Sequence, residues 1–272
     1  MVGAMLSAAA AVVGLYLLLV LGMALGQRGM IYVPDRTPDD PETSGVPDMV
    51  PVPLRAEDGV VVTGWYAPPA RPGLQTVVLF HGNAGTKAGR AFKARALIAA
   101  GHGVFLAEYR GYAGNPGRPS ERGLFADARA VVDWLAARGT PSGALVLYGE
   151  SLGSGVATAM ATRCPPRALI LECPFTAIAD LAPAFVPAAL ARVLLVDRYD
   201  NLGRIGGLTA PLLVIHGEQD EVVPVAQARA LLARAASADK QGVFLALAHH
   251  NDLWEFGAAD QILAFLDGLP RR

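Results

Sequence analysis

The chain has 272 residues, 53% of them hydrophobic and 17% charged, which is enough for one large core or two small ones. The formal net charge of −1 provides no broad positive field, which argues against nucleic acid as a partner. The two cysteines, Cys164 and Cys173, cannot form a disulfide framework and lack the clustered spacing of a structural zinc site.

The first predicted element is a membrane-spanning helix. No charged side chain occurs between Met1 and Arg28, and "VVGLYLLLVLGMAL" is almost wholly apolar. About 25 such residues can cross a bilayer. The alternative is a secretory signal peptide cleaved near Ala24-Leu25-Gly26, but the basic n-region is missing and the apolar run exceeds a typical h-region. We therefore predict an uncleaved, single-pass anchor at residues 1–27.

The charges that flank this helix leave the side of the membrane open. Arg28 and Arg36 follow the span and none precedes it, which favours a cytoplasmic location for the rest of the chain. Acidic residues that follow the span closely weaken this preference: Asp35, Asp39 and Asp40.

A connector and a folded domain are predicted after the anchor. Residues 28–50 are rich in proline and acidic side chains and indicate an extended connector. From residue 51 to residue 272, short aliphatic runs alternate with longer segments rich in alanine and leucine, as in βα units around a mostly parallel sheet with helices on both faces. The predicted strands are Val60–Tyr66, Thr76–Phe80, Val104–Tyr109, Ala144–Tyr148, Ala168–Glu172, Pro211–Ile215 and Val243–Ala248, and the predicted helices are Lys87–Ala100, Glu121–Arg138 and Leu152–Arg163.

Residues 174–205 interrupt this alternation. Pro183 and Pro187 divide an apolar sequence into short helical pieces, which favours a cap over the sheet. The alternative is an ordinary crossover helix with proline kinks.

A candidate nucleophile, Ser151, lies between the predicted strand at 144–148 and the predicted helix at 152–163. In Gly149-x-Ser151-x-Gly153, the glycines permit close backbone approach at a sharp strand-to-helix turn, and the turn presents the hydroxyl above the sheet. The start of the following helix favours negative charge, so the amide of Leu152 is one candidate oxyanion donor. The loop "LFHGNAGTK" follows an earlier strand and supplies Asn83 as the second.

A serine nucleophile requires a histidine base and a carboxylate that orients it. Of the five histidines, His249 and His250 come just after the last predicted strand, where the base is expected. "VIHGEQDEVVP" presents Asp220, our candidate acid, after the preceding strand. Nucleophile, acid and base thus occur in the chain order of an α/β-hydrolase, although the spacing does not separate His249 from His250.

Several motifs together resemble the Bem46-like α/β-hydrolases. They are "QRGMIYVP", "DGVVVTGWYAPP", "LFHGNAG", "EYRGYAGNPGRPSERGL", "YGESLGSGVA", "LECPFTAIADLA", "PLLVIHGEQDEVVP" and "HND". The resemblance implies Ser151 as nucleophile, Asp220 as acid and His250 as base, supports Asn83 and Leu152 as oxyanion donors, and implies a retained membrane anchor. Two departures from the family pattern occur, in the tract with Ala113 and Asn115 and at Cys173.

The resulting prediction is a membrane-anchored serine hydrolase of α/β-hydrolase fold that cleaves carboxylic ester or thioester bonds. It requires no metal and no organic cofactor. The expected substrate is a small acyl compound drawn from a lipid or an acylated protein. The alternatives are a serine peptidase or amidase on the same fold, because the same triad cleaves amides, and a non-catalytic membrane-tethered binding protein.

Overall fold

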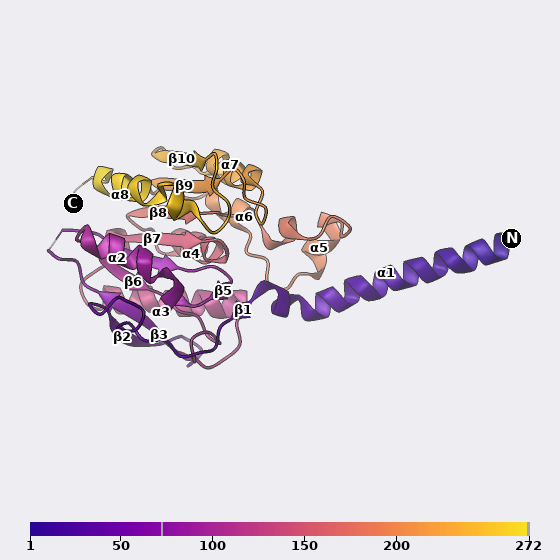
Figure 1. Ribbon diagram of the computed structural model, residues 1–272, viewed down its shortest axis with the longest axis horizontal. Coiled ribbons are helices and arrows are strands. Elements are labelled where there is room, and N and C mark those ends of the chain that lie inside the picture. The colour runs from indigo at the N-terminus through magenta and orange to yellow at the C-terminus, as the bar shows by residue number, and fades with distance from the viewer. Residues whose placement is uncertain (72, 271–272) are drawn as a thin grey trace.

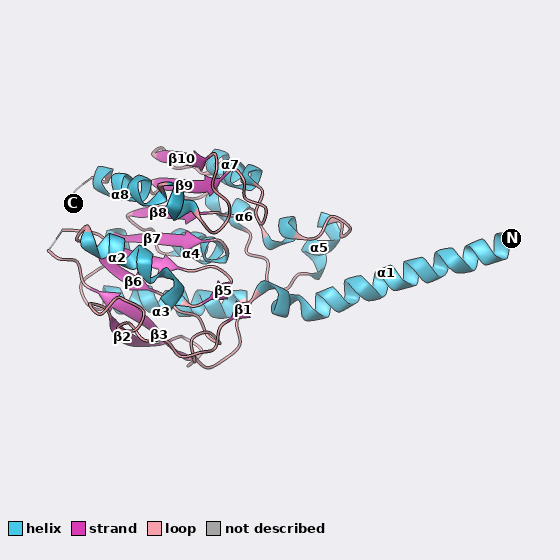
Figure 2. Cartoon of the chain, in the orientation of Figure 1, coloured by secondary structure: helices cyan, strands magenta, loops and turns pink. Residues whose placement is uncertain are grey.

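An eight-stranded sheet of order β10-β9-β8-β7-β4-β6-β3-β2 forms the centre of the molecule in the computed structural model, which describes residues 1–71 and 73–270 (Figures 1 and 2). The six strands from β10 to β6 pair in parallel, and β2 and β3 add an antiparallel edge. The strands are β2 Val50–Arg55, β3 Val61–Ala67, β4 Thr76–Phe80, β6 Gly103–Leu106, β7 Leu145–Glu150, β8 Ala168–Glu172, β9 Leu212–Gly217 and β10 Lys240–Leu245.

Helices cover both faces of this sheet, as the near-continuous apolar strands require. Along β4, Val78 and Phe80 pack on one side, while Val77 and Leu79 pack on the other. The first side is covered by α3 Glu121–Ala136, α4 Leu152–Arg163 and α7 Val225–Arg234, and the second by α2 Ala91–Ala99 and α8 Ala258–Gly268. The predicted mostly parallel sheet with helices on both faces is confirmed.

Some elements differ from the prediction. Strand β2 was not expected because it contains Pro51 and Pro53, which an edge strand tolerates. Strand β10 begins three residues before the predicted range and ends three residues before its predicted end. One boundary agrees with the prediction. The helix α3 begins at Glu121, and the Ser120 side chain caps it by accepting a hydrogen bond from the Gly123 amide at 3.1 Å.

The N-terminal helix α1, Val2–Ile31, projects from the body of the molecule (Figure 1). It is long and apolar enough to cross a membrane, and it continues four residues beyond the predicted end of the anchor at residue 27. After it, β1 Val33–Pro34 pairs in parallel with β5 Ala84–Gly85. The predicted connector is therefore tied to the domain, and Val46 and Met49 within it are buried in the core.

Residues 174–205, named here the cap segment, contain three short helices. They are η3 Ile178–Leu181, α5 Ala188–Leu194 and α6 Asn201–Ile205. Pro187 immediately precedes α5, where a proline needs no amide donor. In Figure 1, α5 lies beside the base of α1, away from the C-terminal end of the chain. The remaining single turns are η1 Lys87–Arg90, η2 Ser142–Ala144 and η4 Leu253–Phe256.

Candidate active site

Ser151 occupies a strained turn between β7 and α4. Its backbone has φ 50° and ψ −117°, a conformation that a residue with a side chain adopts only when its surroundings impose it. The flanking glycines explain how the turn fits. A Cβ on Gly149 would come within 2.6 Å of the Ser154 Cα, and one on Gly153 within 2.6 Å of the Phe80 carbonyl carbon. The glycines at 149 and 153 are therefore required by close packing.

A continuous chain of hydrogen bonds joins Ser151, His250 and Asp220. The Nε2 of His250 lies 3.0 Å from the Ser151 Oγ, and its Nδ1 lies 2.7 Å from the Asp220 Oδ2. The serine follows β7, the carboxylate follows β9 and the histidine follows β10. The carboxyl ends of these parallel strands thus bring together three residues separated by up to 99 positions in the chain.

The surroundings of Asp220 keep its carboxylate ionised. Burial alone would raise the pKa of Asp220, but hydrogen bonds from His216, His250 and the Val223 amide hold it well below its usual value. The Oδ1 accepts from the amides of Val222 and Val223 at 2.8 and 2.7 Å. Since an ionised carboxylate only accepts hydrogen bonds, the Nδ1 of His250 carries the proton and its Nε2 is free to accept from the serine hydroxyl.

The contact between His216 and Asp220 was not predicted from the sequence. The His216 ring is fully buried at the end of β9, with Nε2 3.0 Å from the Asp220 Oδ2 and 2.9 Å from the Val223 carbonyl oxygen. Both partners accept, so Nε2 donates. The signal in the sequence that could have indicated this contact is a histidine near the end of a strand, four residues before the predicted acid.

Two other histidines point elsewhere. The Nδ1 of His249 pairs with the Glu221 carboxylate at 3.0 Å on the surface, so His250 rather than His249 contacts the serine. The buried His81 lies 2.6 Å from Glu108 through its Nε2 and 2.8 Å from the Gly82 carbonyl through its Nδ1. Through these two contacts, the His81 ring holds the loop that follows β4.

Asn83 and Leu152 line the same cavity as Ser151. Leu152 is the first residue of α4, so its amide has no acceptor within the helix. The Asn83 carbonyl accepts from the Val33 amide at 3.0 Å and from the Tyr112 hydroxyl at 2.8 Å, which fixes the peptide from two sides. The two residues predicted to supply the oxyanion donors therefore line one cavity together with Ser151.

A cavity of about 370 Å³ opens beside Ser151. Most of its lining is apolar, and only Gln27, Asn83 and Ser151 carry polar side chains. Three parts of the chain form its walls: the C-terminal half of α1, the cap segment from Phe175 to Leu195, and the turn at Val222 and Val223. A cavity of this size and character suits a small apolar ligand with few polar groups.

Comparisons with known proteins identify the family. Residues 72–198 match the family model described as serine aminopeptidase, S33. The uncharacterized protein Rv2307c of Mycobacterium tuberculosis is 42% identical over 228 residues, 83% of this chain and 81% of that protein. The alpha/beta hydrolase domain-containing protein WAV2 of Arabidopsis thaliana is 31% identical over 226 residues, 75% of this chain and 73% of that protein. The chain belongs to the α/β-hydrolase family.

Other similar proteins are esterases and lipases. Lysophosphatidylserine lipase ABHD12 of Macaca fascicularis is 34% identical over 194 residues, 64% of this chain but only 48% of that protein. The esterase Pf2001 of Pyrococcus furiosus shares the fold at a TM-score of 0.69 and 17% identity, over 88% of this chain and 98% of that chain. The predicted α/β-hydrolase fold is confirmed, and the chain is related in sequence to a lipase of the α/β-hydrolase family.

A largely buried ion cluster lies beside the serine turn of this α/β-hydrolase. It consists of Arg90, Lys93, Glu150 and Glu172. The Lys93 Nζ lies 2.6 Å from the Glu150 carboxylate and 2.9 Å from that of Glu172, and Arg90 also binds Glu150. Although burial alone would raise the pKa of Glu150, Lys93 and Arg90 hold it below its usual value. Because Glu150 directly precedes Ser151, the cluster fixes the chain next to Ser151.

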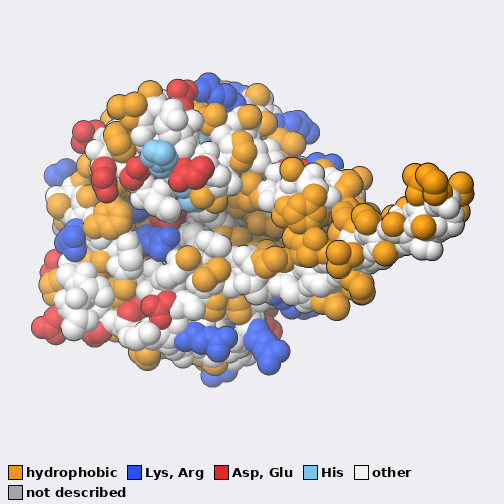
Figure 3. All heavy atoms as spheres, turned by 45° about the vertical axis from the view of Figure 1, so that its right-hand side comes forward, with side chains coloured by type: hydrophobic (Ala, Val, Ile, Leu, Met, Phe, Trp, Pro, Cys, Tyr) orange, Lys and Arg blue, Asp and Glu red, His pale blue; other side chains and the backbone are white. Residues whose placement is uncertain are grey.

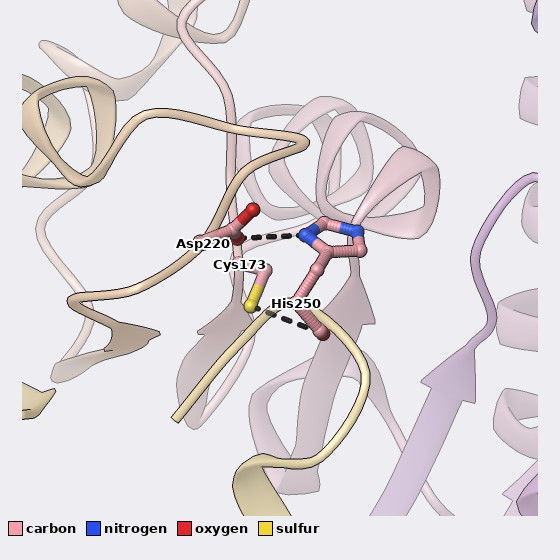
Figure 4. A group of neighbouring side chains, drawn as sticks. All are labelled: Cys173, Asp220 and His250. Carbon is pink, nitrogen blue, oxygen red and sulfur yellow. Dashed lines mark hydrogen bonds and ion pairs between the residues drawn. The ribbon is translucent and has the colours of Figure 1, made fainter. Parts of the chain in front are cut away.

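One group of potential metal ligands in the hydrolase overlaps the serine site. Figure 4 shows the Asp220 carboxylate joined to the His250 ring and the Cys173 thiol joined to the His250 backbone, and one possible ligand atom from each residue lies within 4.8 Å of the others. A thiol binds metal as its thiolate, but burial, with the nearby Glu172 and Asp220 carboxylates, raises the pKa of the Cys173 thiol well above its usual value. Asp220 and His250 already bind each other. This group therefore fits a metal poorly.

Proposed function

We propose that the chain is a membrane-anchored serine hydrolase that cleaves carboxylic ester or thioester bonds through an acyl-enzyme intermediate. The observation that carries this proposal is the unbroken hydrogen-bonded path from the Ser151 Oγ through His250 to Asp220, which opens onto an apolar cavity. The strained turn at Ser151 supports the same reading, because strain of this kind is kept where a side chain must be held in one position.

The proposed reaction follows from this geometry. The Ser151 Oγ attacks the acyl carbonyl carbon while the Nε2 of His250 takes the hydroxyl proton. The amides of Asn83 and Leu152 donate to the oxyanion of the tetrahedral intermediate, each interaction contributing about 3 kcal/mol. His250 then gives its proton to the leaving oxygen or sulfur. A water molecule, activated by the same imidazole, releases the acid and restores the serine.

Asp220 holds the imidazole in the productive tautomer throughout. Its carboxylate stays ionised, so it accepts from the Nδ1–H and stabilises the imidazolium formed during attack. His216 acts behind it as a positioning residue, since its buried Nε2 donates to the Oδ2 that binds His250.

The proposed substrate class is an acyl ester of a lipid or of an acylated protein. The mostly apolar lining of the cavity and the apolar helix beside it support this class. A relative named lysophosphatidylserine lipase agrees with it. We also place the chain among the Bem46-like members of the family, on the motifs that it shares with them.

The proposed organisation follows the same evidence. Residues 1–27 form a single-pass anchor, residues 28–50 a connector and residues 51–272 the catalytic domain, with residues 174–205 as its cap. The length and apolarity of α1 support the anchor, and Arg28 and Arg36 after it favour a cytoplasmic catalytic domain.

A second candidate function is amide cleavage. The description of the matching family model, serine aminopeptidase, favours it, and a Ser–His–Asp triad also hydrolyses amides when the leaving amine is protonated. The two functions separate on substrates that share an acyl group and differ only in the leaving group. Faster release from the ester than from the matched anilide, beyond their difference in intrinsic reactivity, supports the esterase.

The proposal is tested by labelling with a fluorophosphonate, which reacts only with an activated serine. Wild type and Ser151→Ala are compared first, and p-nitrophenyl esters of graded chain length are then hydrolysed by wild type. We expect labelling and turnover in wild type and neither in Ser151→Ala. Folded wild type that takes no label would contradict catalysis and would leave a membrane-tethered binding protein as the better description.

A further inference from the structure

The helix α1 presents one distinct face to the rest of the chain. Most of its side chains are exposed, but Val20 and Gln27 are each only 6% exposed, and Met23 and Ala24 between them are partly buried. These positions recur three or four residues apart, so they lie on one side of the helix. The same four side chains line the cavity beside Ser151. The helix that could span the bilayer is therefore also a wall of the candidate active site.

A set of polar contacts, named here the α1–cap joint, fixes this face against the cap segment. The side chain of Gln27 accepts from the Val196 amide at 2.7 Å and donates to the Leu194 carbonyl at 3.2 Å. Arg28 forms an ion pair with Asp197 at 2.8 Å, and the Tyr32 hydroxyl donates to the same carboxylate at 3.1 Å. Gln27 lies in an otherwise apolar stretch, and both ends of its amide have partners in the cap segment.

The end of α1 is also joined to the loop that carries Asn83. One residue beyond Tyr32, the Val33 amide donates to the Asn83 carbonyl, and β1 continues this pairing with β5. The helix thus contacts the cap segment on one side of the cavity and the proposed oxyanion loop on the other.

The position of the cavity along α1 sets its depth in a membrane. A 30-residue helix is roughly 45 Å long. The hydrocarbon core of a bilayer is about 30 Å thick, so about ten residues of α1 extend into the interfacial region. The charged Arg28 places the C-terminal end there, and the residues of α1 that line the cavity all lie between Val20 and Ile31. The cavity therefore lies at the boundary between hydrocarbon and headgroups.

The surface around this boundary is apolar. Figure 3 shows hydrophobic side chains along the projecting helix and continuing over the adjoining part of the body, around a recess between them. Three large apolar side chains of the cap segment contribute to the exposed surface: Phe185 at 51%, Val193 at 75% and Val196 at 67%. Contact with acyl chains would remove these side chains from water.

We propose that α1 is the acyl-chain wall of the active site and that the substrate enters sideways from the bilayer, between α1 and the cap segment. The substrate is a membrane-resident ester with one acyl chain, which lies along Val20, Met23 and Ala24 while its carbonyl reaches Ser151 and its head group stays in the interface. A cavity near the lower end of the range for small-molecule sites, about 300–1,000 Å³, accommodates one such chain. This inference rests on the proposed esterase function and adds to it the route and class of substrate.

Two neighbouring residues of α1 provide the test. Ala24 lines the cavity, whereas Leu25 is 81% exposed and faces away from it. Full-length wild type, Ala24→Trp and Leu25→Trp are placed in phosphatidylcholine vesicles, and kcat/KM is measured for p-nitrophenyl palmitate and p-nitrophenyl acetate. In Ala24→Trp the ratio of palmitate to acetate turnover is expected to fall at least tenfold. Leu25→Trp is expected to keep the wild-type ratio within twofold, and an equal fall in both variants overturns the proposal.

A second variant covers the case in which Ala24→Trp does not fold. Asp197→Asn weakens the α1–cap joint without adding bulk, and it should also lower the palmitate-to-acetate ratio, whereas Asp180→Asn, which disturbs an ion pair with Arg192 inside the cap segment, should not. A ratio unchanged in Asp197→Asn overturns the proposal. Fluorophosphonate labelling separates the two claims: labelled wild type with an unchanged ratio removes only the acyl-wall inference, and unlabelled wild type removes the esterase as well.

Discussion

The two sides of the cavity are built in opposite ways. The polar side belongs to the sheet, where strand ends, a strained turn and buried ion pairs hold Ser151, His250 and Asp220. The apolar side comes from α1 and the cap segment, which lie outside the sheet and meet through a few polar contacts. Under the proposed esterase function, this difference predicts that mutations can alter the chemistry and the choice of acyl chain separately.

The largest expected effect comes from the polar side. Asp220→Asn should lower kcat about 10⁴-fold, because an asparagine in place of the carboxylate stabilises the wrong tautomer of His250. Palmitate and acetate esters should be affected equally, which is measured by comparing both rates with those of wild type. Glu221→Gln is the control, since Glu221 pairs only with the surface residue His249. A fall restricted to one ester would show that the two sides are not separable.

The same carboxylate has a defined pH dependence. Because the folded pKa of Asp220 is depressed, its stabilising contribution is present above the ordinary carboxyl pKa of about 3.9 and is lost as pH falls through the lower folded value. Its charge is therefore constant between pH 8 and pH 5. Any loss of turnover in that window must arise from another group.

The next largest effect is expected on the free energy of unfolding, when a residue of the buried ion cluster is replaced. Lys93→Met removes the cation shared by Glu150 and Glu172 and leaves Glu172 with only neutral donors such as Tyr148, so the free energy of unfolding should fall by about 3–5 kcal/mol. Denaturant unfolding of the full chain in detergent measures this. Arg129→Met removes an exposed ion pair with Asp133 and should change stability by less than about 1 kcal/mol. Equal stability of the two variants would mean that the cluster does not hold the serine turn.

The smallest effect is expected at a residue that belongs to neither side. His249→Ala should leave kcat/KM for both esters within twofold of wild type, because its ring faces solvent and pairs with Glu221. His250→Ala is the matched variant and should lose turnover. Activity retained in His250→Ala and lost in His249→Ala would reverse the assignment of the base.

The strands that carry the polar side were predicted from the sequence far better than the packing of the apolar side. Strands such as Thr76–Phe80 and Ala168–Glu172 are continuous apolar runs with the bounds expected, and the residues after parallel strands meet at one edge of the sheet by topology alone. The edge strand β10 was predicted three residues too late in the chain. Its first residues, Lys240 and Gln241, are polar and exposed, and such residues are typical of loops as well as of edge strands.

Contacts that depend on side-chain packing could not be predicted. The ion pair of Lys93 with Glu150 joins residues 57 positions apart, and no local pattern specifies it. The face of α1 that packs against the cap segment is hidden for a different reason. Because nearly every residue of that helix is apolar, no periodicity marks one side, and the single amide of Gln27 is the one local signal.

The shared wall has a practical consequence for preparing the protein. Deleting a hydrophobic N-terminal helix is a common way to make an anchored enzyme water-soluble. Here a chain shortened to start after Ile31 would lack every α1 side chain that lines the cavity, and it would leave cap residues such as Leu194 and Leu195 facing water. Such a soluble form would give a misleading substrate profile even if every atom of the hydrogen-bonded triad were in place.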